Sequence, residues 1–159
     1  MKNKKEYRRM VKSLKAALAR GQIKVHVTVS NGVLAGEYLW ATPVGKNQAR
    51  IDNIPVVADY IGQNDIVEVS ASTNPLDHEY LRTIKRGSYT GFVQYANKEE
   101  SNKAIVKKYV KLCSLLNAKG IETEACVPGY CAVAIPLRMG IRKAKQLFNS
   151  LPEVLSYDF

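Results

Sequence analysis

The sequence predicts an α+β fold with three parts: a basic N-terminal helix, a small β-rich, half-barrel-like subdomain and a ferredoxin-like βαββαβ unit. Two observations predict it. Apolar residues recur every three to four positions in one segment near the start and in two segments of the last third, which is typical of helices. In the region between, they recur at every second position, which is typical of strands. The 159 residues suffice for one compact domain and not for two full-sized ones. We therefore expect one compact unit composed of 1–21, 22–87 and 88–159.

Residues 3–20 are expected to form an amphipathic helix, which Gly21 is suited to end. Its apolar face is narrow and its opposite face is basic. The apolar positions are Tyr7, Met10, Val11, Leu14 and Leu18. The cations at the start of this helix oppose its dipole, which is an unusual arrangement.

The β-rich part begins with an alternating run over residues 23–30, followed by the hairpin signal Asn31-Gly32. We expect a second strand over 34–42, ended by Pro43 and Gly45. Further strands are expected at 49–52, 65–72 and 79–86.

The last part alternates strands and helices. Ser101 is expected to cap a helix that runs to about residue 118, with Gly120 closing it. Its core stripe is Ile105, Tyr109, Leu112, Cys113 and Leu116. The remaining elements are expected to be strands 89–95, 121–127, 130–135 and 154–157 and a helix over 140–150 that buries Ile141, Ala144, Leu147 and Phe148.

A segment of the middle region carries three features in order: Trp40 in a strand, then Asn53-Ile54-Pro55, then the strand start Asp65-Ile66-Val67. In these features the chain resembles an uncharacterised bacterial family, the domain of unknown function 4265. The resemblance covers about residues 36–159. It also implies a βαββαβ second half with a proline after the fourth strand, where this chain has Pro136.

One position departs from that family pattern. Asn64 stands where the family has a glycine before Asp65, and asparagine also tolerates a positive φ. The family has no established activity, so the resemblance predicts a fold and no function. It covers about residues 36–159, and the helix at 3–20 therefore lies outside it.

Composition excludes several classes of protein. No run approaches about 20 apolar residues, so we expect no membrane span and no secretion signal. The three cysteines, Cys113, Cys126 and Cys131, fit a reducing cytoplasm better than a disulfide framework. With only His26 and His78 beside them, they lack the spacing of a zinc site. We expect no metal and no cofactor.

The sequence shows no catalytic constellation. His26 lies at an outward strand position and His78 lies in a loop beside Asp77, so both are expected to be solvated. Possible paired acids are scattered over turns and strand ends, where carboxylates usually cap backbone groups. They are Asp52, Asp59, Asp65 and Glu68. No glycine-rich phosphate loop occurs. We therefore predict that the protein is not an enzyme.

The run Gly91-Phe92-Val93-Gln94-Tyr95 resembles the aromatic strand of RNA-recognition domains. In those domains it is the third strand, whereas here it is the first strand of the expected unit. We therefore expect its aromatic residues to pack in the core or on the sheet.

Charge provides the strongest functional signal. The net charge is +10, and residues 1–20 hold eight basic side chains against Glu6 alone. Such a face suits a negatively charged partner. A membrane surface is disfavoured, because the apolar face has no Trp or Phe. The residues expected to bind the partner are Lys5, Arg8, Arg9, Lys12, Lys15, Arg82, Lys85, Arg86, Arg142 and Lys143.

We expect a non-enzymatic bacterial or phage binding protein that masks or sequesters its partner. We favour an acidic protein such as an effector, toxin or defence component, which would make the chain an immunity protein or a counter-defence inhibitor. Two alternatives stay open. The same basic face suits nucleic acid, with affinity that falls steeply with salt. The cleft between the two halves could also hold a small anionic ligand.

Overall fold

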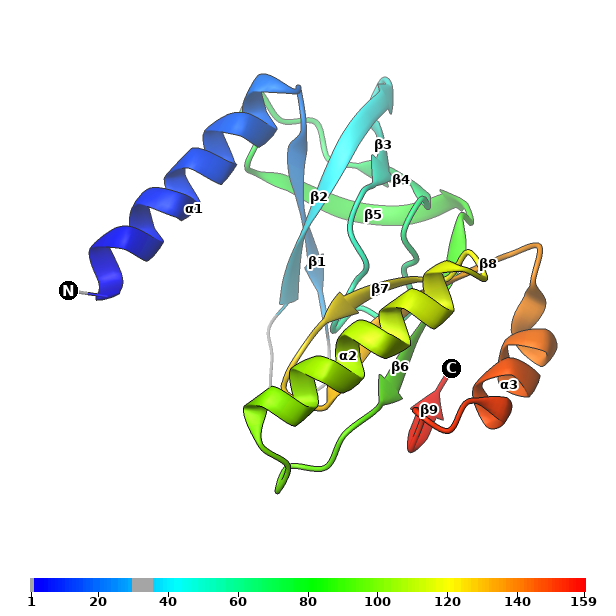
Figure 1. The fold of residues 1–159 in the computed structure, drawn as a ribbon. Helices are drawn as coiled ribbons and strands as arrows, with labels where there is room; N and C mark the ends of the chain where they lie inside the picture. The colour runs from blue at the N-terminus through cyan, green and yellow to red at the C-terminus, as the bar shows by residue number, and fades with distance from the viewer. Residues whose placement is uncertain (1, 30–35) are drawn as a thin grey trace.

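A computed structural model describes residues 2–29 and 36–159 of the chain, and for residues 2–5 only the backbone. Figure 1 shows the fold. The first half consists of helix α1 (Lys2–Ala19) and strands β1 (Ile23–Thr28), β2 (Gly36–Gly45), β3 (Gln48–Ile51), β4 (Ile66–Val69) and β5 (His78–Lys85). The second half consists of β6 (Ser88–Gln94), α2 (Asn102–Asn117), β7 (Glu122–Ala125), β8 (Tyr130–Pro136), α3 (Gly140–Ser150) and β9 (Ser156–Asp158). The predicted turn Asn31-Gly32 lies outside the described residues.

Strands β1 to β5 form a closed barrel. Consecutive strands pair antiparallel, and a short parallel pairing of β1 with β5 closes the ring. Alternation along β1 to β4 puts aliphatic side chains inside, which explains the period of two in the sequence, and β5 contributes the half-buried Tyr80. The barrel core consists of Ile23, Val25, Val27, Leu39, Ala41, Ala49, Ile51, Ala58, Ile61, Val67 and Val69.

The second half is a four-stranded antiparallel sheet in the order β7-β8-β6-β9. Its strands and helices follow the β-α-β-β-α-β order that the sequence predicted. Ser101 caps α2 by accepting a hydrogen bond from the Ala104 N–H at 3.3 Å, as expected. The predicted stripes of α2 and α3 face the sheet. Their buried members are Ile105, Leu112, Leu116, Ala144 and Phe148.

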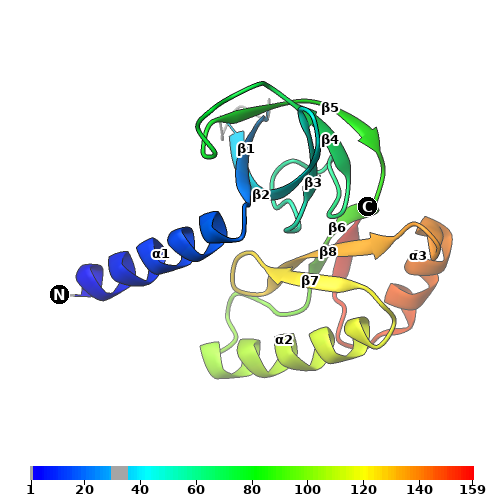
Figure 2. The ribbon, with the colours of Figure 1, turned by 90° about the horizontal axis from the view of Figure 1, so that it is seen from above.

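The molecule has three layers, which Figure 2 shows edge-on: the barrel, the four-stranded sheet, and the helices α2 and α3. The helices cover one face of the sheet, where Val93, Cys131 and Val133 are buried. The opposite face is covered by the connection between β3 and β4, through a small cluster of Ile54 with Ala132 and Ala134. Both faces of the sheet are therefore occupied.

Two carboxylates hold this β3–β4 connection. Glu37 on β2 accepts hydrogen bonds from the backbone N–H groups of Val56, Val57 and Ala58 at 2.9, 2.9 and 3.1 Å. Asp65, which has no exposed surface, accepts from the N–H groups of Gly62 at 2.9 Å and Gly87 at 2.7 Å. These bonds satisfy buried donors that no strand partner reaches.

Three expectations need correction. The β-rich part is a closed barrel and not a half-barrel, because β5 pairs with β1, which lies far away in the sequence. Strand β2 runs through Pro43 to Gly45, because a register shift there accommodates a residue without an N–H group. Asp65 precedes β4 and does not start the strand. Asn64 has a φ of +65°, as the asparagine in place of glycine led us to expect.

Gly21 ends α1 in a left-handed conformation, with a φ of +74°. The Gln22 N–H donates to the Ala17 carbonyl and the Gly21 N–H donates to the Leu18 carbonyl, which is the Schellman pattern. No atom lies within 4 Å of a Cβ added at this position. The substitution Gly21→Ala is therefore expected to lower the free energy of unfolding by about 1 kcal/mol through backbone strain alone.

Urea titration monitored by circular dichroism measures this effect. Gly45→Ala is the control, because its φ is not positive and its added Cβ would meet Gln48 at an ordinary 3.4 Å. An equal loss in both variants would contradict the assignment of strain to Gly21.

Candidate functional site: the projecting basic helix

Helix α1 projects away from the rest of the molecule in both views (Figures 1 and 2). Its C-terminal end is attached to the barrel: Ala17 is only 4% exposed, and the Gln22 side chain that follows the helix donates to Asp52 at 2.7 Å. Asp52 also accepts from Thr42 at 2.7 Å, so this carboxylate links α1 to β2. An 18-residue helix is about 27 Å long, and only its last turns contact the body.

The apolar face of α1 lies largely uncovered. Tyr7 and Met10 are each 61% exposed, whereas Val11 and Leu14 are half-buried. These four residues occupy positions i, i+3, i+4 and i+7, which is the spacing of anchors that a helix inserts into a partner's groove. Single exposed apolar residues are common, but an aligned set on a projecting helix is a candidate interaction surface.

The basic side chains of α1 lie beside and opposite this apolar face: Arg8 and Lys15 are next to it, and Arg9 and Lys12 are on the other side of the helix. Arg8, Arg9, Lys12 and Lys15 are exposed, and no acidic group pairs with them among the side chains that the structure describes. The side chain of Lys5 lies outside the described set. The first turn of α1 has no acidic residue that would interact favourably with the positive end of the helix dipole.

The other predicted binding residues do not join this surface. Arg82 and Lys85 lie on β5, and Arg142 and Lys143 are exposed on α3, which both views place on the opposite side of the molecule from α1. The ten basic residues therefore do not make one face.

Two of these basic residues already have acidic neighbours. Arg82 contacts Glu68 at 2.5 Å, and Arg86 contacts the buried Asp65 at 3.2 Å. Arg86 therefore helps to hold the β3–β4 connection, which is a structural role that the sequence did not indicate.

The two histidines are not simply solvated, contrary to expectation. His26 on β1 packs on the Tyr38 ring at 4.7 Å between centroids, and its Nδ1 lies 3.0 Å from a Glu79 carboxylate oxygen. His78 is half-buried, and its Nδ1 lies 3.0 Å from the Ser70 carbonyl oxygen. Both contacts come from strand pairing across the barrel, which sequence spacing does not reveal.

The four acidic residues considered for general acid–base chemistry lie in separate places. Asp52 links α1 to the barrel, Asp65 binds backbone N–H groups, and Glu68 contacts Arg82, while Asp59 is exposed. Their contacts are those of structural acceptors and ion pairs.

A different acidic pair lies where the barrel meets the sheet. Glu124 on β7 accepts a hydrogen bond from the Ile54 N–H at 3.1 Å. Ile54 lies two residues before Val56, the first residue whose N–H binds Glu37. Burial raises the pKa of the Glu124 carboxyl above its ordinary value, and the negative charge of Glu37 adds to this rise. No local pattern connects residues 87 positions apart, so the sequence could not have indicated this pair.

The three cysteines are free thiols, of which Cys131 is buried and Cys113 and Cys126 are half-buried. Burial raises the pKa of Cys126, and it raises that of Cys131 to about 12. A raised pKa disfavours the thiolate, which is the reactive and metal-binding form. Within the described residues, no group of three His, Cys, Asp or Glu side chains is arranged to hold a metal ion.

The strand that resembles an RNA-binding strand does not present an open stacking surface. Tyr95 is 3% exposed in the helix-facing core, and Phe92 packs on the other face with Ile54 and Ala132. Tyr89 alone among its aromatic residues is exposed. The β3–β4 connection thus occupies the face that would have to stack on bases.

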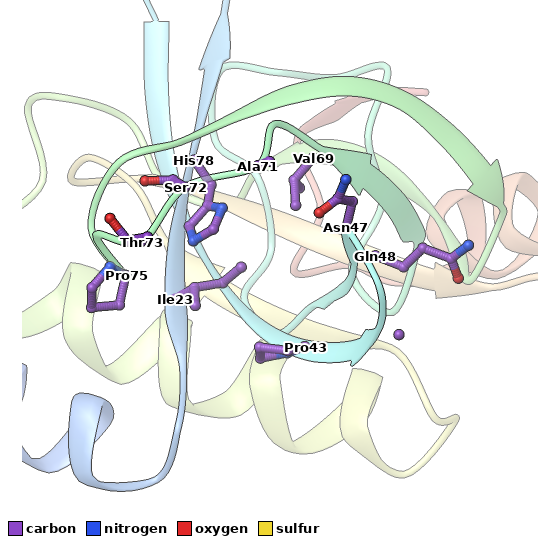
Figure 3. A pocket seen from close by; sticks show the side chains of 11 residues that line it. Ile23, Pro43, Asn47, Gln48, Val69, Ala71, Ser72, Thr73, Pro75 and His78 are labelled. Atoms are coloured by element: carbon purple, nitrogen blue, oxygen red, sulfur yellow. The ribbon is translucent and has the colours of Figure 1, made fainter.

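A cavity of about 520 Å³ lies at the end of the barrel where β1 and β5 begin and β2 and β4 end (Figure 3). The β3–β4 connection, which contacts the sheet, leaves the barrel at its other end. This cavity is therefore distinct from the cleft between the two halves, which the sequence analysis considered as an alternative site for a small anionic ligand.

Across residues 2–29 and 36–159, no helix is long and apolar enough to cross a membrane.

The fold and this surface define an α+β protein in which a β-barrel stacked on a helix-backed sheet carries a projecting basic helix. The chain belongs to the family described as "Domain of unknown function (DUF4265)", whose model matches residues 37–158, and the resemblance in the sequence is thereby confirmed. Helix α1 and strand β1 precede the matched residues. Among curated proteins, no match was found.

A solved structure described as "Novel crystal structure of a hypothetical protein from Neisseria gonorrhoeae" has a similar fold. The TM-score is 0.58 and the sequence identity is 17%, over 86% of this chain and 91% of that chain. At this identity the similarity concerns the fold alone.

Proposed function

We propose that this protein is a non-enzymatic binding protein that inserts α1 into an apolar groove with an acidic rim on a partner protein, and so masks that partner. The observation that carries the proposal is the exposure of Tyr7 and Met10 on a projecting helix that also carries four exposed basic side chains. The apolar residues supply the anchors, and the cations supply steering and selectivity.

Charge favours an acidic partner over a second copy of the chain. Two α1 helices packed against each other would bring two strongly basic segments together, because residues 1–20 carry eight basic side chains and one acidic one. An acidic rim would instead oppose those charges. It would also place carboxylates near the positive end of the helix dipole, where they stabilise a helix.

The spacing of the cations supports the same conclusion. Arg8 and Lys12 are four residues apart, so their charges repel each other along the free helix. Neutralisation by a partner removes this repulsion. Nucleic acid would also neutralise the cations, but it offers no apolar groove for Tyr7 and Met10, and for that reason we favour a protein.

The proposal extends to the setting of the protein. We propose a cytoplasmic bacterial or phage protein whose partner is an effector, toxin or defence protein. The three free thiols support a reducing compartment. We further propose that the second half is a ferredoxin-like unit that acts as scaffold, supported by its β-α-β-β-α-β order and by the covering of both faces of its sheet.

Substitution of α1 tests the proposal. The pair Arg8→Glu and Lys12→Glu is expected to weaken partner binding by about tenfold or more, since each exposed ion pair contributes up to about 1 kcal/mol. The pair Tyr7→Ala and Met10→Ala is expected to weaken it by about 30-fold or more, as for buried anchors. Affinity capture from a host lysate with quantitative mass spectrometry identifies candidates, and calorimetry on each purified candidate measures the affinity.

The matched control is the pair Arg142→Glu and Lys143→Glu on α3, which changes the net charge equally and is expected to leave binding unchanged. The affinity for labelled duplex DNA and for single-stranded RNA, measured at low salt, tests the nucleic-acid alternative. Tight nucleic-acid binding that depends on Arg8 and Lys12 but not on Tyr7 and Met10 would contradict the protein partner. Equal losses in the α1 and α3 variants would contradict α1 as the binding surface.

A further inference from the structure

The cavity at the end of the barrel has a framework held by hydrogen bonds. Its rim includes the 70–77 loop, which is tied to β1 by the Lys24 N–H to Pro75 carbonyl bond at 2.7 Å. The base of this loop is closed by two bonds between Ser70 and Glu79, each 2.8 Å long. On the other side, the Val69 N–H donates to the Asn47 carbonyl at 2.9 Å. The cavity is thus formed before any ligand enters, and its volume of about 520 Å³ is within the usual range of small-molecule sites.

His78 presents a defined acceptor to this space. Its Nδ1 lies 3.0 Å from the Ser70 carbonyl oxygen, which can only accept, so Nδ1 carries the proton and donates. In the neutral ring Nε2 is then an acceptor. No donor from the described part of the chain bonds to Nε2, and Figure 3 shows the imidazole pointing into the cavity.

The other lining groups restrict the ligand's chemistry. Ile23, Pro43, Val69 and Pro75 provide apolar walls, and the side chains of Ile23 and Val69 point inward in Figure 3. Among the described lining residues no side chain carries a fixed charge. A charged ligand would lose hydration without gaining a counter-ion, whereas a neutral apolar ligand would gain from burial.

We infer that the barrel end is a binding site for a small, neutral, largely apolar molecule with one N–H or O–H group, which donates to Nε2 of His78. This site is independent of the proposed role of α1, because none of its lining residues lies on that helix. It differs from the anionic-ligand site considered above in both place and charge.

Indole is a suitable probe, because it is neutral and apolar and has one N–H donor. Benzofuran is the matched control ligand, with the same bicyclic shape and a ring oxygen in place of the N–H group. Titration of the ¹⁵N-labelled full-length protein is followed by NMR. Indole is expected to shift the amide resonances of Ile23, Val69 and His78 with millimolar affinity, and benzofuran is expected to bind roughly 2- to 10-fold more weakly, as for the loss of one hydrogen bond.

Substitutions distinguish the contribution of the His78 acceptor to ligand binding from the contribution of the cavity itself. His78→Asn preserves a side-chain donor near the Ser70 carbonyl and removes the acceptor at the position of Nε2. It is expected to make indole and benzofuran bind equally. His78→Phe provides a second test, because it preserves a ring and lacks both nitrogens. Ala71→Trp fills the cavity mouth and is expected to abolish the binding of both probes.

Three results would overturn the inference. They are equal binding of indole and benzofuran to the unsubstituted protein, shifts confined to residues away from the barrel end, and an unchanged preference for indole in both His78 variants. Loss of the preference in folded His78→Asn or His78→Phe protein, with benzofuran binding unchanged, supports the inference.

Discussion

The substitution Asp65→Ala is expected to lower the free energy of unfolding by about 3–5 kcal/mol, because each hydrogen bond to a charged acceptor contributes about 1.5–3 kcal/mol. The Asp65 carboxylate has no exposed surface. It binds the N–H groups of Gly62 and Gly87 at 2.9 and 2.7 Å and the Arg86 guanidinium at 3.2 Å. Alanine would leave the buried Gly62 N–H without an acceptor, and it would remove the carboxylate partner of the half-buried Gly87 N–H and of Arg86.

Gly87 makes the region sensitive to repacking. A Cβ at this position would lie 2.2 Å from the carbonyl carbon of Asn64, so the two backbone segments are already at their closest approach. The protein therefore cannot relax inward to find new acceptors for the freed N–H groups. Local collapse, which reduces the cost of many core substitutions, is not available here.

Urea unfolding followed by the fluorescence of Trp40, the single tryptophan of the chain, measures the effect. Glu68→Ala is the control, because Glu68 contacts Arg82 in a pair whose arginine side chain is 73% exposed. The control is expected to change stability by less than about 1 kcal/mol. A loss of that small size for Asp65→Ala would show that the carboxylate is not needed to hold the β3–β4 connection.

Glu37→Ala is expected to lower the free energy of unfolding by about 2–4 kcal/mol. The Glu37 carboxylate accepts three backbone N–H bonds from residues 56–58, with N···O distances of 2.9 to 3.1 Å. Bonds to a charged acceptor contribute more than neutral ones, and each unpaired donor has a cost of its own. Since residues 53–58 also cover the sheet, the loss is expected to loosen the contact between barrel and sheet.

Hydrogen exchange separates this local effect from general destabilisation. The amides of residues 56–58 are expected to lose protection in Glu37→Ala, while those of α2 retain it relative to global unfolding. Glu79→Ala is the control, because the Glu79 side chain is 52% exposed and its carboxylate is paired with His26 on the barrel, away from residues 56–58. Uniform loss of protection across the molecule would contradict a local role for Glu37.

Much of the local structure could be predicted from the sequence. The stripes of α2 and α3 follow from periodicity, and the start of α2 follows from capping by Ser101. Both signals act over a few residues. The left-handed Gly21 follows for the same reason. The predicted end of β2 at Pro43 was wrong, because a bulge accommodates proline and depends on how the partner strand is aligned.

The candidate interaction surface could be predicted only in part. The amphipathic, basic character of α1 is evident from residue spacing, but its projection from the body is not. The sequence analysis grouped Arg142 and Lys143 with α1 because they share its charge. The fold places them on the opposite side, so charge alone did not indicate a common face.

By itself, then, the sequence determined the α+β class, the order of helices and strands, the family and the basic amphipathic helix, because these depend on local spacing and composition. The tertiary structure alone decided the closure of the barrel by β1 and β5, the covering of the sheet by residues 53–58, and the ligand-sized space beside His78. Each of these requires residues that are far apart in the chain to meet, and such contacts are set by the packing of the whole domain and leave no periodic pattern in the sequence.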